Sequence, residues 1–250
     1  MIIIGNIVGQ YSLLICKKEE RMKAIIALSG GIDSAVAAAI AKSQGYDLYF
    51  LTVNYGQKNI QKELEYSKKL AEYFGVKEHK IIEMKWLGEL GNSGVTDQNI
   101  RFENNSDDAI YVPYRNTNII SACIAWAEVN GADVIYTGSE AGPWICPDNS
   151  PEYYEAFNKL VQVSMKFNKK LQIVAPVNYM TKVQDVQKGI ELGVPFEYTW
   201  TCVANDDVAC GICQPCRGRL AAFEALGVKD PIPYATLDAP MTRKRIKEEE

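Results

Sequence analysis

Hydrophobic and polar residues along the chain alternate between short apolar runs and longer segments with helical character. The apolar runs have the length and composition of buried parallel strands, and they lie at residues 24–28, 48–53, 76–84, 133–137 and 171–177. The helical segments lie at residues 32–42, 62–74, 119–129, 152–168 and 182–192. This alternation predicts a doubly wound parallel α/β sheet, in which ligands bind at the carboxyl ends of the strands.

One long segment, residues 86–109, departs from this pattern. It is rich in Gly, Asn, Asp and Ser and shows no apolar period. Irregular segments of this length in a compact domain are commonly lids or disordered loops. We therefore expect a mobile flap over the active site, and a second loop at residues 141–151, which contain three prolines.

The turn between the first strand and the first helix reads Ser29-Gly-Gly-Ile-Asp-Ser34. The two glycines let the backbone turn sharply and approach a ligand, and the amides that open the following helix favour an anion. The serine hydroxyls add donors, and the Asp33 carboxylate could hold a magnesium ion. No Walker-type or dinucleotide glycine pattern is present. The turn predicts a phosphate site; the alternative is a tight turn in which Asp33 only starts the helix.

Two basic residues stand at the start of predicted helices. Lys182 follows Thr181, a plausible helix cap, although the helix dipole disfavours a cation in the first turn. A bound phosphate would remove that objection. Arg115 precedes the helix at 119–129 and could hold a carboxylate or phosphate through two parallel hydrogen bonds. The alternative for Arg115 is a surface ion pair.

Composition narrows the function classes. The chain has 250 residues, 47% hydrophobic and 23% charged, as is ordinary for a globular enzyme. A net charge of −4 argues against broad nucleic-acid binding. A single histidine, His79, excludes a multi-histidine metal site, and its position just before an apolar run favours a strand-edge side chain over a catalytic one. We therefore expect the chemistry to use nucleotides, carboxylates, Lys, Arg or thiolates.

Four of the seven cysteines lie within fifteen residues, namely Cys202, Cys210, Cys213 and Cys216. An odd total with one tight cluster favours a metal site in the cytoplasm over a disulfide framework. Four thiolates are the ligands of a closed structural zinc site. An iron–sulfur cluster and unligated buried thiols are the alternatives.

The chain ends and the order of the motifs suggest four segments. Residues 1–21 are expected to be an extension without signal-peptide or membrane-spanning character, and residues 238–250 a polar tail. Between them we place an ATP-binding domain at 22–198 and a cysteine segment at 199–237.

Taken together, these motifs resemble those of the 7-cyano-7-deazaguanine synthase family, within the ATP-pyrophosphatase superfamily. The resemblance covers residues 22–234. It rests on the order of residues 29–34, 55–57 (Tyr-Gly-Gln), 112–116 (Val-Pro-Tyr-Arg-Asn), 147–148 (Pro-Asp), 181–182 (Thr-Lys), 199–202 (Thr-Trp-Thr-Cys) and 210–217.

The resemblance implies an adenine-nucleotide-hydrolase-like fold, ATP with Mg²⁺, one structural zinc ion per chain and a cytoplasmic homodimer. It also implies the ATP-dependent conversion of 7-carboxy-7-deazaguanine and ammonia to the nitrile, through an adenylated carboxylate and then an adenylated amide. The catalytic roles it implies fall on Asp33, Arg115 and Lys182. The nucleotide-binding positions it implies are Leu28, Ser29, Gly30, Gly31, Ile32, Asp33, Ser34, Ala35, Val36, Tyr55, Gly56, Gln57 and Asp148.

Four positions depart from the family pattern where substrate recognition is expected: Asn59, Gly142, Cys146 and Asn149. These departures leave open an ATP-using relative that activates a different acid or a tRNA base. A zinc-bearing interaction protein that has kept the fold is a third hypothesis, and the intact residues 29–34 argue against it.

Overall fold

The computed structural model describes residues 21–91, 93–97, 99–100, 111–140 and 146–236. Within these ranges five strands form one parallel sheet in the order β3-β2-β1-β4-β5. The strands are β1 (Lys23–Ala27), β2 (Asp47–Asn54), β3 (Glu78–Glu83), β4 (Val134–Thr137) and β5 (Gln172–Val174). The parallel α/β fold predicted from the sequence is confirmed.

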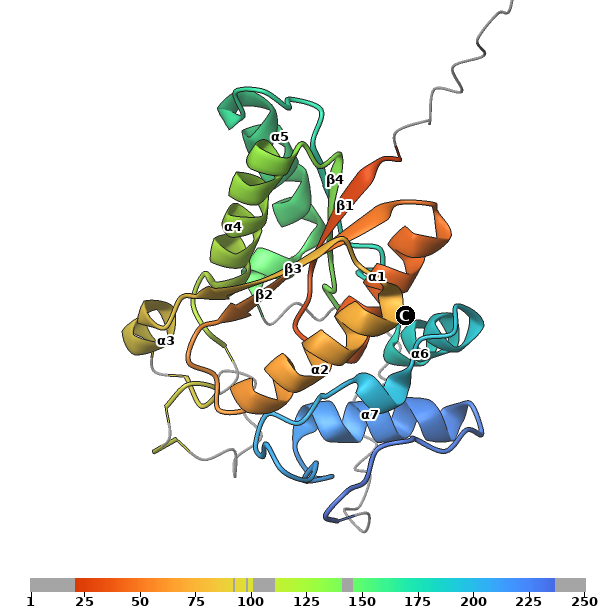
Figure 1. The fold of residues 1–250 in the computed structure, drawn as a ribbon. Helices are drawn as coiled ribbons and strands as arrows, with labels where there is room; N and C mark the ends of the chain where they lie inside the picture. The colour runs from red at the N-terminus through yellow and green to blue at the C-terminus, as the bar shows by residue number, and fades with distance from the viewer. Residues whose placement is uncertain (1–20, 92, 98, 101–110, 141–145, 237–250) are drawn as a thin grey trace, which may run out of the picture.

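Helices cover both faces of this sheet (Figure 1). They are α1 (Ile32–Ser43), α2 (Ile60–Phe74), α3 (Trp86–Leu90), α4 (Arg115–Asn130), α5 (Pro151–Ser164), α6 (Lys182–Glu191) and α7 (Gln214–Ala225), with short 3-10 turns at Pro147–Asn149 and Phe196–Tyr198. Figure 1 shows α4 and α5 on one side and α1, α2, α6 and α7 on the other. None of the described helices is long and apolar enough to cross a bilayer.

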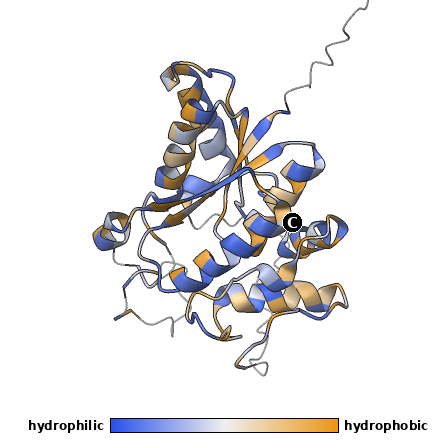
Figure 2. Ribbon diagram, in the orientation of Figure 1, coloured by the Kyte–Doolittle hydropathy of each residue, from blue (hydrophilic) through white to orange (hydrophobic). Residues whose placement is uncertain are grey.

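Each face of the sheet has its own hydrophobic core. On β1, Ile26 packs with the α1 side, whereas its neighbour Ile25 packs with the α4 side. The same alternation places Phe50 and Leu51 of β2 in opposite cores. Strands buried on both faces need no polar side, which is why they read as continuous apolar runs. In Figure 2, by contrast, α2 carries hydrophilic residues along most of its length.

Besides shifts at the ends of other elements, such as α5 ending at Ser164 rather than at 168 and β5 ending at Val174 rather than at 177, three differences from the sequence prediction stand out. Helix α4 begins at Arg115, four residues before the predicted start at 119, because its polar first turn carries no apolar signal. The short helix α3 occurs inside the predicted irregular segment, where Leu87 is buried. Residues 92, 98 and 101–109 of the predicted flap, like residues 1–20 and 237–250, lie outside the described residues.

The third difference is α7, which the sequence analysis did not predict. Its residues Ala222 and Phe223 join the core beside α1 and α6. Through α7, the cysteine segment therefore joins the hydrophobic core on this side of the sheet. Where one unit ends and the next begins stays a prediction.

Candidate active site

The turn after β1 is shaped by its glycines and serines. Gly30 has φ +84°, and a Cβ there would lie 3.0 Å from the Glu63 carbonyl oxygen of α2. The Ser34 hydroxyl donates to the Gly31 carbonyl oxygen (3.1 Å), and the Gly31 amide donates to the Ser29 hydroxyl (3.2 Å). The Trp200 amide donates to the Gly30 carbonyl oxygen at 2.8 Å, which joins the turn to the cysteine segment.

The end of β4 lies directly against the start of α1. A Cβ on Gly138 would be 2.4 Å from the Ser34 amide nitrogen and 2.7 Å from the Asp33 carbonyl carbon. No side chain larger than hydrogen fits there without moving backbone. The carboxyl ends of β1 and β4 therefore meet around the N-terminus of α1, whose unpaired amides favour an anion.

Lys182 lies beside this helix end, as the first residue of α6. Thr181 and Gln184 form a reciprocal cap that fixes the start of the helix. The Lys182 ammonium contacts the Asp33 carboxylate and the Glu140 carboxylate, the latter at 3.1 Å. Burial alone would lower the pKa of Lys182, but Asp33 and the neighbouring acids outweigh it and raise the pKa. Lys182 is thus a fixed cation at the turn.

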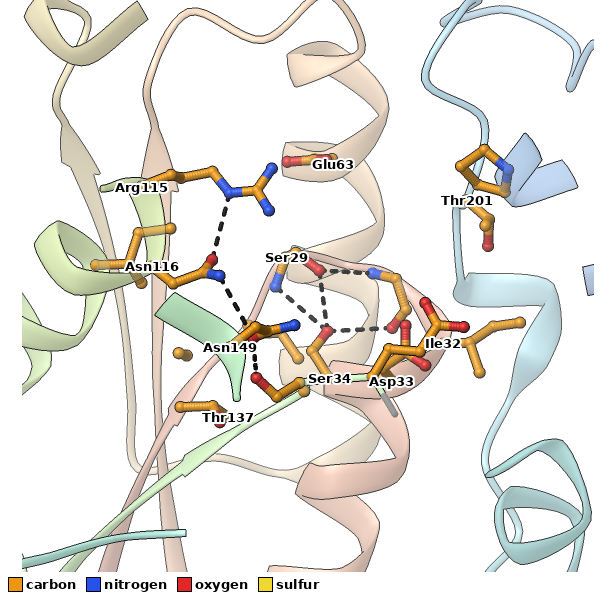
Figure 3. Close-up of a pocket in the computed structure, with 18 of the residues that line it drawn as sticks. Ser29, Ile32, Asp33, Ser34, Glu63, Arg115, Asn116, Thr137, Asn149 and Thr201 are labelled. Carbon is orange, nitrogen blue, oxygen red and sulfur yellow. Dashed lines mark hydrogen bonds between the residues drawn. The ribbon is translucent and has the colours of Figure 1, made fainter. Parts of the chain in front are cut away.

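A second group of polar residues lies across the hollow from the turn. Figure 3 shows the Arg115 guanidinium directed toward Glu63. The guanidinium carbon lies 5.7 Å from the centre of the Tyr55 ring. The Glu63 carboxylate accepts from Gln57 Nε2 (2.6 Å) and Asn59 Nδ2 (3.1 Å). Burial raises the pKa of Glu63 to about 7, although these donors and the Arg115 charge oppose the rise.

These groups enclose one cavity of ≈ 510 Å³ (Figure 3). The site residues expected from the sequence that line it are Leu28, Ser29, Gly31, Ile32, Asp33, Ser34, Tyr55, Arg115 and Lys182. Residues from opposite ends of the chain meet here, since Trp200, Thr201 and Pro215 also line the wall. The cavity combines a helix end that favours an anion, two cations and several apolar side chains.

Six expected nucleotide-binding residues are not among those that line the cavity: Gly30, Ala35, Val36, Gly56, Gln57 and Asp148. Asp148 instead accepts from the Asn116 and Thr117 amides at 3.0 and 3.2 Å, and so caps the N-terminus of α4. Gln57 is buried and hydrogen-bonds the backbone of Tyr55 and Val53. In this structure the side chains of both residues hydrogen-bond to the protein backbone and are not part of the cavity lining.

The four clustered cysteines converge as the spacing suggested. Their sulfur atoms all lie within 4.8 Å of one another, and all four residues are buried. A tetrahedral zinc ion with bonds of about 2.3 Å would separate its sulfurs by about 3.8 Å, so the group fits such an ion. The Cys210 amide donates to Cys202 Sγ at 3.4 Å, and the Cys213 amide donates to Cys210 Sγ at 3.3 Å. Such donors stabilise thiolates.

Comparison with known proteins decides the family. The model of the queuosine biosynthesis protein QueC matches residues 23–227. The chain belongs to the QueC family.

QueC relatives match nearly end to end. A 7-cyano-7-deazaguanine synthase of Chlorobium chlorochromatii is 39% identical over 221 residues, which cover 86% of this chain and 97% of the relative. One of Methanospirillum hungatei is 38% identical over 219 residues, covering 85% of this chain and all (100%) of the relative.

Two solved structures are similar to this chain at a greater distance. A 4-thiouridine synthetase in complex with RNA and bound ATP is 18% identical, with a TM-score of 0.45 over 82% of this chain and 50% of that chain. NMN synthetase from Francisella tularensis is 18% identical, with a TM-score of 0.42 over 86% of this chain and 76% of that chain. These likenesses are too distant to bear on function.

The QueC motifs did not reveal every charged residue in the cavity or next to it. Glu63 and Asp185 lie in helical segments rich in charged residues, and an acidic residue in such a segment is normally predicted to be exposed to solvent. Their burial depends on contacts between elements, so spacing alone could not identify them. Trp200 and Thr201 carried a signal, since they belong to the Thr-Trp-Thr-Cys motif, but no role had been assigned to them.

Three of the four departures from the QueC pattern line the cavity: Asn59, Cys146 and Asn149. The Asn59 amide donates to Glu63 and to the Cys202 carbonyl oxygen (3.0 Å), so it links the cavity wall to the cysteine segment. Asn149 contacts the Ser139 hydroxyl at the end of β4. Gly142 lies outside the described residues.

Proposed function

We propose that this chain is an ATP-dependent C–N ligase that converts 7-carboxy-7-deazaguanine and ammonia to 7-cyano-7-deazaguanine. Membership of the QueC family and relatives named 7-cyano-7-deazaguanine synthase support the product. The observation that supports the use of ATP is the N-terminus of α1, with Lys182 held beside it and Arg115 on the other side of the same cavity.

The triphosphate is placed at the turn of residues 29–34. The α1 amides and Lys182 would stabilise the charge that develops on the departing pyrophosphate. Asp33, on the cavity side of the turn, would hold a magnesium ion. When bound, this ion supplies charge neutralisation.

The acid is placed at the Arg115 side of the cavity, where the guanidinium would orient its carboxylate. A carboxylate oxygen attacks the α-phosphorus of ATP, and pyrophosphate leaves. Ammonia then attacks the carbonyl carbon, AMP leaves with one substrate oxygen, and the primary amide forms after proton loss. The amide oxygen attacks the α-phosphorus of a second ATP, and pyrophosphate leaves. Loss of AMP, which takes that oxygen with it, and of the two nitrogen protons gives the nitrile.

The proposal includes one structural zinc ion on the cysteines and a cytoplasmic homodimer. The converging sulfurs support a tetrahedral metal ion. Capture of such an ion can contribute on the order of 10 kcal/mol to folding in small modules. Elemental analysis tests the metal, since iron with visible absorbance would identify a cluster instead. Analytical ultracentrifugation tests the dimer.

The decisive test incubates the protein with ATP, Mg²⁺, ammonia and 7-carboxy-7-deazaguanine, and follows AMP and the nitrile by mass spectrometry. We expect two AMP for each nitrile. A protein that binds ATP but forms neither AMP nor nitrile from this acid would contradict the proposal.

A second candidate is a relative that adenylates a different carboxylic acid. The observation that favours it is that Asn59, Cys146 and Asn149, which depart from the family pattern, all line the cavity. A panel of heteroaromatic acids, scored for AMP release, separates the two. Release with another acid but not with the deazapurine would establish the second candidate.

A further inference from the structure

Glu63 of α2 is an acidic residue of the cavity wall that lacks a cation in contact with it. Three of the described acidic residues line the cavity, namely Asp33, Glu63 and Glu140. Asp33 and Glu140 share the Lys182 ammonium. Glu63, by contrast, forms no ion pair with a Lys or Arg side chain in the described part of the chain. The negative charge of Glu63 is therefore available to a cation in the cavity.

Neutral donors hold the Glu63 carboxylate from one side. Gln57 Nε2 donates to Oε2 at 2.6 Å, and Asn59 Nδ2 donates to Oε1 at 3.1 Å. A carboxylate oxygen has two lone pairs, so each oxygen keeps one that these amides do not use. Glu63 is half-buried and lines the cavity. A small ligand that carries N–H donors and a positive charge therefore suits this carboxylate.

Arg115 faces Glu63 inside the cavity without pairing with it. Figure 3 shows the guanidinium directed toward the Glu63 side chain. Its hydrogen bonds to described residues run from Nε to Asn116 at 3.3 Å and from Nη1 to the Tyr55 hydroxyl at 3.5 Å. Nη2 donates to none of the described residues, which leaves it able to bind a carboxylate. A group that binds anions and a group that binds cations thus face each other in one cavity.

We propose that Glu63 binds ammonium and takes the proton that ammonium loses before its nitrogen attacks the adenylated acid. This inference rests on the proposed function, which supplies the acid and the ammonia. With the acid on Arg115 and ammonium on Glu63, positive and negative charges alternate from the guanidinium to the Glu63 carboxylate. The same arrangement places the nitrogen beside the carbon that it attacks.

The proton transfer gives the nitrogen its nucleophilic electron pair. Ammonium has no free pair, and transfer of one proton to a Glu63 oxygen yields ammonia and a neutral carboxylic acid. The nitrogen pair forms the C–N bond to the carbonyl carbon, and the C–O bond to AMP breaks with its pair on AMP. The nitrogen then loses a second proton to solvent, which leaves the primary amide. Glu63 returns its own proton to solvent.

The acidity of Glu63 suits a general base. Burial raises the pKa of Glu63 to about 7, and Gln57, Arg115 and Asn59 oppose the rise. A base is most effective when its pKa lies near the working pH. Bound ammonium lowers this pKa again, because an opposite charge favours the carboxylate. Glu63 is therefore ionised when ammonium binds at neutral pH and is able to receive the proton.

Other titratable groups around Glu63 stay in one state near pH 7. Arg115 from α4 stays charged, and burial raises the pKa values of the Tyr55 phenol and the Cys146 thiol, which stay neutral. The charged residues at the turn pair with one another. The cysteine segment contributes only uncharged residues to the cavity lining. Arg115, Tyr55 and Cys146 thus cannot mimic the titration of Glu63.

The test separates adenylation from the attack of the nitrogen by means of Glu63→Gln, which keeps the size of the side chain but removes the base. Acid-dependent exchange of labelled pyrophosphate into ATP, without ammonia, should stay within about twofold of wild type. Amide formation at low ammonium concentration and neutral pH should fall by about a hundredfold or more. Glu72→Gln, at an exposed position of the same helix, is the matched control and should match wild type in both assays.

Hydroxylamine is the second nucleophile, because it is uncharged at neutral pH and has a free electron pair without help from a base. Glu63→Gln should form the hydroxamate, followed by mass spectrometry, at a rate within about fivefold of wild type. The pH dependence gives a third measure. In wild type kcat/KM for total ammonia should rise up to about pH 7 and then level off, as Glu63 ionises. In Glu63→Gln it should keep rising with the fraction of free ammonia.

The outcomes separate this proposal from its alternatives. Equal losses of exchange and amide formation in Glu63→Gln would assign Glu63 a structural role and overturn the proposal. A higher KM for the acid with an unchanged KM for ammonium would place the ring of the acid on Glu63 and overturn it too. An equal loss with hydroxylamine and with ammonium would do the same. Absence of exchange in wild type with every acid tested would contradict the proposed function itself, and the ammonium site with it.

Discussion

The buried Arg219 of α7 is expected to hold one wall of the cavity in place. Its side chain is 0% exposed and forms a two-pronged pair with Asp230, at 2.7 and 2.8 Å. The same guanidinium donates to the carbonyl oxygens of Thr199 and Phe196, both at 3.0 Å. These bonds fix the segment that carries Trp200 to the cavity.

Arg219→Met keeps the aliphatic bulk but removes every donor. Asp230, 4% exposed, would keep only the Tyr234 hydroxyl (2.6 Å) and the Ile232 amide (3.2 Å) as donors. Breaking a buried pair in this way costs about 3–5 kcal/mol, because a charge remains buried without its partner. The folded-to-unfolded ratio would fall by roughly a hundredfold to a few thousandfold.

Urea unfolding of the metal-loaded protein, followed by tryptophan fluorescence, measures this loss. Arg217→Met on the same helix is the matched control, and we expect it to stay within about 0.5 kcal/mol of wild type. Adding Asp230→Asn to Arg219→Met should recover about 1 kcal/mol or more, since the stranded charge is removed. A loss below about 1 kcal/mol for Arg219→Met, or no recovery in the double variant, would refute the reasoning.

Three further predictions concern the site. Gly138→Ala forces a methyl group against the Ser34 backbone, so it should destabilise the fold by about 1–3 kcal/mol in urea unfolding and reduce the rate of AMP release. Gly91→Ala is the control: its methyl group would make only ordinary van der Waals contacts, so neither quantity should change. Asp33→Asn should abolish AMP release while the zinc content of the cysteine cluster, measured by mass spectrometry, is unchanged; an unaltered rate would show that the turn has been misassigned. Cys213→Ser should lower metal content and solubility, and full metal retention would argue against a four-thiolate site.

The features that could be predicted from the sequence are those that depend on local patterns of residues. Strands buried on both faces read as apolar runs, and the order of strands and helices led to the parallel sheet. The residues of the turn could be found because Gly, Ser and Asp each have a distinct use at a helix start. The thiol cluster could be found because its spacing is short.

The features that could not be predicted depend on contacts between segments that are distant in the sequence. The family resemblance implies a nucleotide-binding role for Asp148, but no local pattern shows that its carboxylate caps α4 about thirty residues earlier in the chain. Helix α7 was missed because its buried face includes Arg219, which pattern analysis treats as solvated surface. Burial of Glu63 and Asp185 likewise arises only when α2 and α6 close on the turn.

The central claim is that the turn of residues 29–34 presents the α-phosphorus of ATP to a carboxylate. It is tested most directly with substrate acid labelled with oxygen-18 at both carboxylate positions. Attack on the α-phosphorus predicts one labelled oxygen in each of the two AMP molecules formed per nitrile, and none in pyrophosphate. Unlabelled AMP, or label in pyrophosphate or inorganic phosphate, would contradict the account.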